Sequence, residues 1–165
     1  MKQVYIAGSL FKSGDIKERI EEGRQLREQG LKTFNPIEQP FNDDKSKKPT
    51  AHEIFKGDTN AIIDSDIIFA EYDGEDPGVM AELGITWAIN DALDFFEKGG
   101  TIEEYKAKYK KKEVIVHSTD IRQGSAGEYD GHYVPYGLNQ YVVGMIEDQG
   151  TIFTNKQKAI EKAGK

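Results

Sequence analysis

The chain has 165 residues, of which 37% are apolar and 31% are charged, with a formal net charge of −7 and no cysteine. This length suits one domain over residues 1–165 with a full hydrophobic core, and the lack of cysteine excludes disulfides, thiolate metal ligands and a cysteine nucleophile. The acidic balance argues against nucleic acid as a partner, and without a signal peptide or an apolar run of about 20 residues we expect a cytoplasmic protein that does not enter a membrane.

Apolar runs and helical patterns alternate along the chain. A glycine stop, a capping box and a candidate break are the local signals for where two of the helices begin or end. Ile16, Ile20 and Gly23 recur at helical spacing ahead of Gly30, a typical glycine stop. In chain order, the first expected elements are a strand over 4–7, a helix over 15–29, a strand over 31–34 and a helix over 50–65, which has a capping box of Thr50 and Glu53 and a candidate break at Gly57. They are followed by a strand over 66–71, a helix that carries Glu82 and runs to Phe96, and a short helix or exposed connection over 101–112. The last expected elements are a strand over 114–116, an amphipathic helix over 138–147, an edge strand over 151–153 and a helix over 155–162.

Strands that alternate with helices are typical of βαβ units and a parallel sheet. The sequence therefore predicts a five-stranded parallel sheet, doubly wound like flavodoxin or Rossmann domains, in three layers. Residues 37–50 are expected to form a polar loop. Residues 118–135 are long, polar and glycine-rich, which is typical of a functional loop rather than a plain connection.

The strongest chemical signal is the stretch from Asp76 to Gly84. It follows an apolar strand through an acidic, glycine-bearing loop, and it places Glu82 among apolar residues early in a helix. Ligands of open α/β sheets bind outside the carboxyl ends of the strands, where such a helix begins. Glu82 is therefore either a solubilising surface carboxylate or a working one, and Asp76 either a simple helix cap or a second acid at the same place.

Other polar residues converge on the same sheet edge if this topology holds. Asp58 precedes the third strand, and Tyr5 and Gly8–Ser9 lie at the end of the first, which is usually central. Carboxylates around one apolar pocket can split their pKa values into an ionised nucleophile and a protonated acid, an arrangement that cleaves glycosidic bonds. The alternatives remain open at this point: Asp58 can be a solvated helix residue, and Gly-Ser turns are common.

Four motifs, taken in chain order, resemble those of the nucleoside 2-deoxyribosyltransferase family. They are Tyr5-Ile6-Ala7-Gly8-Ser9-Leu10-Phe11, then Asp58 ahead of Asp64-Ser65-Asp66, then Asp76, Gly78, Glu82 and Gly84 in the order Asp-x-Gly-x-x-x-Glu-hydrophobic-Gly, and last Asn139 in Pro135-Tyr136-Gly137-Leu138-Asn139. The resemblance covers most of residues 2–90 and 112–146.

This resemblance implies double displacement without a metal or organic cofactor. Glu82 would attack the anomeric carbon of a 2′-deoxynucleoside and form a deoxyribosyl ester, and Tyr5 would orient it. Asp76 would exchange a proton with the nucleobase, and Asp58 would hold the sugar hydroxyls. A second base would then take the sugar, so deoxynucleosides and free nucleobases are the expected partners. The remaining expected substrate contacts are Gly8, Ser9 and Gly78.

The resemblance also implies a homo-oligomer in which Asn139 contacts the sugar 5′-hydroxyl in a neighbour's site. The helix after Asn139 is expected to expose Tyr141, Val142 and Met145, an apolar set that an interface would bury. Two features depart from the family pattern. The chain ends in Lys162-Ala163-Gly164-Lys165 rather than an aromatic tail, and residues 91–111 and 120–134 are longer. The candidate base or lid contacts in the second of these stretches are Arg122, Tyr129, His132 and Tyr133.

Two other functions compete with transfer. A related hydrolase would cleave 2′-deoxynucleoside 5′-monophosphates, for which Ser9 and the Ser13–Gly14 turn would have to cradle a phosphate. A non-catalytic nucleotide-sensing module of the same fold is the third candidate. Asn139 suits a neutral 5′-hydroxyl, which favours the transferase, and a sensor would leave the carboxylate of Glu82 unexplained.

Overall fold

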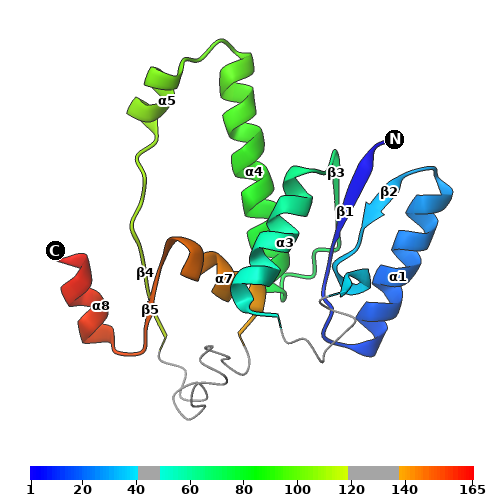
Figure 1. Ribbon diagram of the computed structural model, residues 1–165, viewed down its shortest axis with the longest axis horizontal. Helices are drawn as coiled ribbons and strands as arrows, with labels where there is room; N and C mark the ends of the chain where they lie inside the picture. The colour runs from blue at the N-terminus through cyan, green and yellow to red at the C-terminus, as the bar shows by residue number, and fades with distance from the viewer. Residues whose placement is uncertain (41–48, 119–137) are drawn as a thin grey trace. The chain divides into compact units, whose positions relative to one another are not determined.

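The computed structural model describes residues 1–40, 49–118 and 138–165, and the chain forms two compact units (Figure 1). The first comprises Met1–Pro49 with Lys56–Lys110, and the second comprises Thr50–Phe55 with Lys111–Lys165. Almost all of the functional loop predicted over 118–135 lies outside the described residues, including Arg122, Tyr129, His132 and Tyr133. None of the helices within the described ranges is long and apolar enough to cross a membrane.

A three-stranded parallel sheet forms the centre of the first unit, with the strand order β2-β1-β3. The strands are β1 (Gln3–Ala7), β2 (Lys32–Phe34) and β3 (Ile67–Ala70). The four residues from Val4 to Ala7 are at most 1% exposed, as expected of a strand with neighbours on both edges. The prediction that the first strand is central is therefore confirmed.

Helix α1 (Ser13–Glu28) covers one side of this sheet, and the later part of α3 (Ala51–Ile63) and α4 (Pro77–Glu97) cover the other (Figure 1). The core between the sheet and the latter two helices contains Tyr5, Ala7, Ala61, Ile62 and Val79. Because side chains alternate along a strand, Tyr5 and Ala7 face this core together. The three-layer arrangement predicted for the fold is thus present within the first unit.

The ends of these helices follow from local sequence signals. Gly30, with φ of 79°, takes the left-handed conformation after α1, and the short 3-10 helix η1 (Pro36–Glu38) follows β2. The predicted capping box of α3 is present: the Glu53 amide donates to Thr50 Oγ1 at 3.2 Å and the Thr50 amide donates to Glu53 Oε2 at 2.8 Å. The helix runs through Gly57 without a break.

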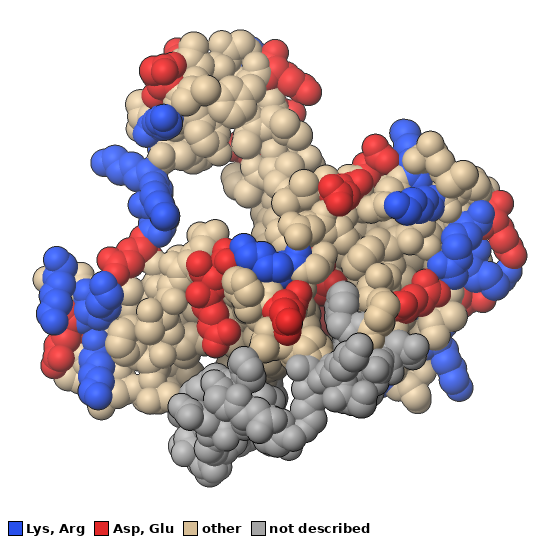
Figure 2. Space-filling view, in the orientation of Figure 1, with Lys and Arg blue, Asp and Glu red and all other residues tan. Residues whose placement is uncertain are grey.

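The buried face of α1 differs from the predicted one. Ile20 is 45% exposed, whereas Arg19 is fully buried and Gly23 is buried with it. Mixed charges cover much of the outer face of α1, where Arg24 pairs with Glu21 at 2.6 Å and also with Glu28 (Figure 2). Apolar spacing predicted that Ile20 is buried. Arg19 is buried instead, because its charge is paired with Glu22 and Glu71.

Aromatic contacts hold α5 (Ile102–Lys108) against the end of α4. The rings of Phe95 and Phe96 lie 5.5 and 5.2 Å from that of Tyr105, and Tyr109 donates a hydrogen bond to Asp91. The segment predicted as either a short helix or an exposed connection is therefore a helix with a packed face.

The second unit contains a two-stranded parallel sheet of β4 (Val114–His117) and β5 (Gly150–Phe153), with α7 (Gln140–Gln149) and α8 (Lys156–Ala163). Helix α7 approaches the first turn of α3 so closely that a Cβ on Gly144 would lie 2.0 Å from the Ala51 carbonyl oxygen. Only glycine permits this contact.

The prediction of one five-stranded sheet is wrong for the described residues, which form one sheet of three strands and one of two. The sequence pattern located all five strands but did not contain their pairing. The 21 residues of α4 extend about 31 Å, well over twice the length of a four-residue strand. The chain passes through α5 before it reaches β4, and β4 pairs with β5.

Candidate active site

The carboxyl ends of β1 and β3 lie level with each other. Ala7 pairs with Ala70 in the register of the two strands, and the Glu71 amide donates to the Ala7 carbonyl at 2.9 Å. The chain then passes through residues 72–75 to Asp76, where α4 begins. The edge at which ligands bind in open α/β sheets is therefore formed by the ends of these strands and the start of α4.

Asp76 and Pro77 fix the start of α4. Asp76 Oδ1 accepts a hydrogen bond from the Gly78 amide at 2.7 Å, and Pro77 occupies the first helical position, where its missing N–H is no loss. The prediction that Asp76 caps the helix is confirmed, and the residue is also buried, with 8% of its surface exposed. The Gly78 amide serves this cap.

Tyr5 and Glu82 form the central contact of the site. The Tyr5 hydroxyl donates to Glu82 Oε1 at 2.6 Å, with Tyr5 fully buried and Glu82 7% exposed. The Tyr5 ring is held in turn by stacking on Phe34, with 5.6 Å between ring centroids. The alternative of a solubilising surface carboxylate is thereby excluded for Glu82, which is an acid in a protein interior.

Burial changes the proton affinity of two carboxyl groups here. It raises the pKa of Glu82 from 4.5 to about 8, against the hydrogen bond from Tyr5, with smaller increases from the negative charges of Asp58 and Asp76. Burial likewise raises the pKa of Asp58 from 3.8 to about 7. The negative charges of Asp58 and Asp76 therefore both act on Glu82, so the fold places both acids near it.

Asp58 is 5% exposed, which excludes a solvated helix residue. Its Oδ1 atom is buried and has no hydrogen-bond partner among the described residues. Buried polar atoms in native proteins are nearly always paired with protein, water or ligand. An acceptor of this kind beside Glu82 and Asp76 is suited to a donor such as a sugar hydroxyl.

The loop after β1 is occupied by contacts within the protein. Ser9 Oγ donates to Asp15 Oδ2 at 2.9 Å, and the Lys12 amide donates to the same oxygen at 3.2 Å. At Gly8 a Cβ would lie 2.0 Å from Nη1 of the buried Arg19. Gly8 and Ser9 therefore have roles within this loop, and their contacts with a substrate stay a prediction.

Asn139 belongs to the second unit, where it caps α7. Its Oδ1 accepts from the Val142 amide at 3.2 Å. The prediction that Tyr141 is exposed is wrong: it is 5% exposed, and its ring packs edge-on against Phe55 at 5.3 Å. Val142 and Met145 are half-buried. The amphipathic pattern located an apolar face, but the first residues of α7 bury part of it within the chain's own fold.

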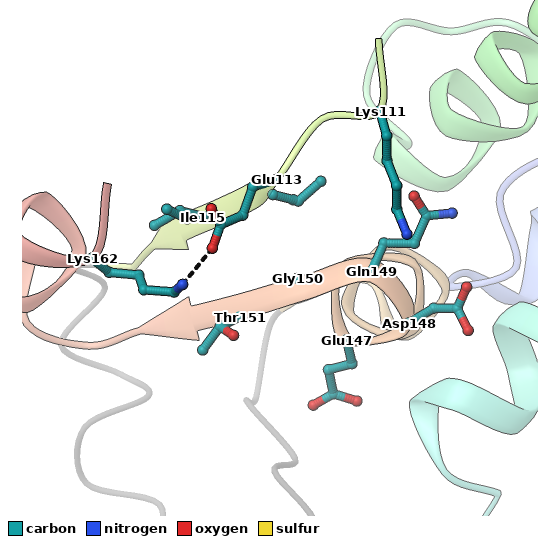
Figure 3. A pocket seen from close by; sticks show the side chains of 10 residues that line it. Lys111, Glu113, Ile115, Glu147, Asp148, Gln149, Gly150, Thr151 and Lys162 are labelled. Atoms are coloured by element: carbon teal, nitrogen blue, oxygen red, sulfur yellow. Dashed lines mark ion pairs between the residues drawn. The ribbon is translucent and has the colours of Figure 1, made fainter. Parts of the chain in front are cut away.

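An open hollow of about 560 Å³ lies in the second unit beside β4 and β5 (Figure 3). Its charged lining residues are Lys111, Glu113, Glu147, Asp148 and Lys162, of which Glu113 and Lys162 pair with each other. No residue predicted for the site lines it. We place the candidate site at the buried acids of the first unit because the raised pKa values of Glu82 and Asp58, and the Asp58 oxygen that has no partner among the described residues, are typical of functional groups. Among the described residues, no group of three or more His, Asp or Glu is arranged to hold a metal ion.

Sequence reasoning missed three polar residues at this edge of the sheet: the buried Arg19 and Asn35, and the exposed Glu71 that pairs with Arg19. Arg19 lies three residues after Ile16 and four before Gly23, so helical spacing alone was a usable signal for its inward position. Asn35 and Glu71 each directly follow a strand. Residues at that position face the ligand edge in parallel sheets.

The chain is similar to known proteins at the level of family, sequence and structure. A sequence model of the family described as nucleoside 2-deoxyribosyltransferase matches residues 4–161. An uncharacterized protein of Ureaplasma parvum serovar 3 is 32% identical over 97 residues, a stretch that covers 53% of this chain and 60% of that protein. The crystal structure of a conserved protein from Enterococcus faecalis V583 is similar at 26% identity, covering 98% of this chain and 96% of that one with a TM-score of 0.48.

The raised pKa of Glu82 makes a prediction about stability. Because the folded state holds this proton more tightly than the unfolded state, the contribution of Glu82 to stability is complete below pH 4.5 and is lost as the pH rises to about 8. We expect Glu82→Gln to remove that fall and to be more stable than wild type at pH 8, by on the order of 5 kcal/mol. Urea unfolding at a series of pH values measures this difference.

Some pH dependence will remain in the variant, since Asp58 titrates in the same way between pH 3.8 and about 7. Glu97→Gln, an exposed change at the far end of α4, is the matched control and should follow the wild-type curve. Equal pH dependence in the wild type and Glu82→Gln would contradict the burial of Glu82.

Proposed function

Since the chain belongs to the nucleoside 2-deoxyribosyltransferase family, we propose that it transfers 2-deoxyribose from one nucleobase to another through a covalent ester on Glu82. The family match supports a deoxyribosyltransferase-like activity, with deoxynucleosides and nucleobases as substrates. The observation that carries the proposal is the buried carboxyl of Glu82, held at 2.6 Å by the Tyr5 hydroxyl and flanked by two further acids.

In the first displacement, a Glu82 carboxylate oxygen would bond to the anomeric carbon while the bond from that carbon to the base nitrogen breaks. The electron pair of the broken bond leaves with the base, which takes up a proton that Asp76 supplies directly or through water. Asp58 would accept hydrogen bonds from the sugar hydroxyls through its unsatisfied oxygen. Tyr5 would fix the attacking oxygen by donating to the other one.

In the second displacement, a nitrogen of another base would attack the same carbon, pass its proton to the Asp76 carboxylate directly or through water, and release the Glu82 carboxylate, so that the sugar keeps its configuration. Low polarity around the ester would limit its hydrolysis by water. Glu82 must be ionised when it attacks, and the cationic transition state of each displacement would compensate the negative charge that burial makes unfavourable. No cofactor takes part in either step.

The competing hydrolase needs an anion site for a 5′-phosphate. The groups that would provide it, Ser9 Oγ and the Lys12 amide, both donate to the Asp15 carboxylate. A phosphate would have to displace this carboxylate or bind beside its negative charge. The loop therefore favours a substrate with a neutral 5′-hydroxyl, which supports the transferase.

A homo-oligomer is part of this proposal, with Asn139 completing a neighbour's site. What supports it is the resemblance of the stretch around Asn139 to the family pattern, within the range that the family model matches; the buried Tyr141 does not support it. An amide both donates and accepts, as a 5′-hydroxyl requires.

The direct test is incubation with deoxyinosine, with and without adenine, while both bases are followed. Transfer releases hypoxanthine from deoxyinosine only when adenine is present. In a parallel incubation with deoxyinosine 5′-monophosphate, the hydrolase would release hypoxanthine without adenine, and a sensing module would release none from either substrate. Glu82→Gln keeps the size and the acceptor for Tyr5 but loses the nucleophile, so we expect activity to fall by about 10³-fold or more. A mass increase of one deoxyribosyl group on the peptide with Glu82, in wild type alone, would identify the ester. Near-normal turnover by Glu82→Gln would refute the mechanism.

For Asp76 we expect a dependence on the leaving group. Asp76→Asn retains an oxygen for the Gly78 amide, so the cap of α4 survives while the acid is lost. Turnover of natural deoxynucleosides should fall by about 10²-fold or more. A substrate whose base leaves without protonation should be affected much less. If both substrates lose the same factor, Asp76 positions the substrate and transfers no proton.

For Asn139 the test is subunit complementation. Asn139→Ser keeps a capping oxygen for α7 but is too short to reach a neighbour. Mixing it with Glu82→Gln, each inactive alone, gives mixed dimers with one site carrying both changes and one carrying neither. We expect about a quarter of wild-type activity at equal mixing, because half of the dimers are mixed and each has one intact site. Proven subunit exchange without recovery would place any role of Asn139 within its own chain.

A further inference from the structure

Arg19 of α1 is fully buried, which is unusual for a charged residue and calls for partners. Its Nη2 donates to Glu22 Oε1 at 2.9 Å, and its Nη1 donates to Glu71. Glu22 lies one turn along the same helix, whereas Glu71 directly follows β3. One guanidinium thus joins α1 to the loop that leads to Asp76.

The same guanidinium rests on the loop after β1. A Cβ on Gly8 would lie 2.0 Å from Arg19 Nη1 and 2.7 Å from its Cδ. Because Arg19 has no exposed surface, its side chain has no room to swing aside. Gly8 is required here as the residue that lets the arginine lie against the backbone.

Asn35, which follows β2, links this strand to Arg19 as well. It is fully buried, and its Nδ2 donates to the Arg19 carbonyl oxygen at 2.8 Å. Gly8, Asn35 and Glu71 are the residues that directly follow β1, β2 and β3. Arg19 therefore contacts the first residue beyond each strand of the sheet, at the edge where the acids of the candidate site lie.

We propose that Arg19 is a positioning residue for the reaction: by joining the ends of the three strands, it fixes the loop from Glu71 to Asp76 relative to Tyr5 on β1. The proposal rests on the function proposed above. The geometry that it maintains includes the 2.6 Å contact between Tyr5 and Glu82, since α4 begins at the end of this loop. Displacements of about 1 Å in a catalytic arrangement can lower rates by about 10²-fold.

A purely structural role is the alternative, since a buried arginine that loses a partner destabilises a protein wherever it lies. Two changes separate the possibilities. Glu71→Gln weakens the arm that reaches the loop, and Glu22→Gln weakens the arm that stays within α1. The side chains of Glu71 and Glu22 are 48% and 18% exposed, so either amide can be accommodated. Each variant removes one anionic partner of the same buried guanidinium. Glu22→Gln is therefore the matched control for Glu71→Gln.

We expect Glu71→Gln to lower kcat by about tenfold or more with a smaller change in KM, and Glu22→Gln to keep kcat within about twofold of wild type. Both are assayed below the onset of their unfolding. Amide hydrogen exchange of residues 71–76 should accelerate in Glu71→Gln and stay at the wild-type rate in Glu22→Gln. Arg19→Lys, which keeps the charge but reaches only one partner at a time, should fall between wild type and Glu71→Gln in both measurements.

Values of kcat for the two glutamine variants within about threefold of each other, or unchanged exchange of residues 71–76 in Glu71→Gln, would overturn the positioning role. The exchange measurement needs no catalysis. A wild-type protein without transferase activity would refute the proposed function, while the exchange comparison would still decide whether Arg19 holds the loop.

Discussion

The hydrogen bond between Tyr5 and Glu82 constrains the structure more than any other contact in the first unit, because it places a carboxyl group where water cannot solvate it. A buried acid is costly when ionised, and the single hydroxyl of Tyr5 offsets this only in part, so the pKa of Glu82 remains raised to about 8. The surrounding fold must supply the rest of the stability. It does so through a central strand whose apolar residues are almost completely buried.

This arrangement illustrates how a protein can be less stable at its functional site than elsewhere. Glu82, Asp58 and Asp76 repel one another when charged, and no described cation pairs with Glu82. The nearby arginine of the same sheet edge, Arg19, is instead committed to Glu22 and Glu71. The ion pairs of Arg19 thus hold the strand ends together, whereas the carboxyl group of Glu82 accepts from the Tyr5 hydroxyl.

The loop after β1 explains how related chemistries can be separated on one fold. A turn between a strand and a helix is a common anion site, since its amides and hydroxyls point toward the ligand. Here the Asp15 carboxylate accepts from both Ser9 and Lys12, so the protein provides its own anion. Selection of a neutral substrate over a phosphorylated one would then arise from charge repulsion as well as from contacts made.

The sequence by itself determined the features that depend on near neighbours. Short apolar runs located the strands, Gly30 and the Thr50–Glu53 pair marked helix ends, and the spacing of Asp76 and Glu82 identified the acids. Only the tertiary structure decided which strands pair, that Arg19 rather than Ile20 is buried, that Tyr141 packs inward, and that Glu82 is almost completely buried. The physical reason is that propensity and capping act within a few residues, whereas burial and the pKa of an acid depend on atoms that only folding brings together.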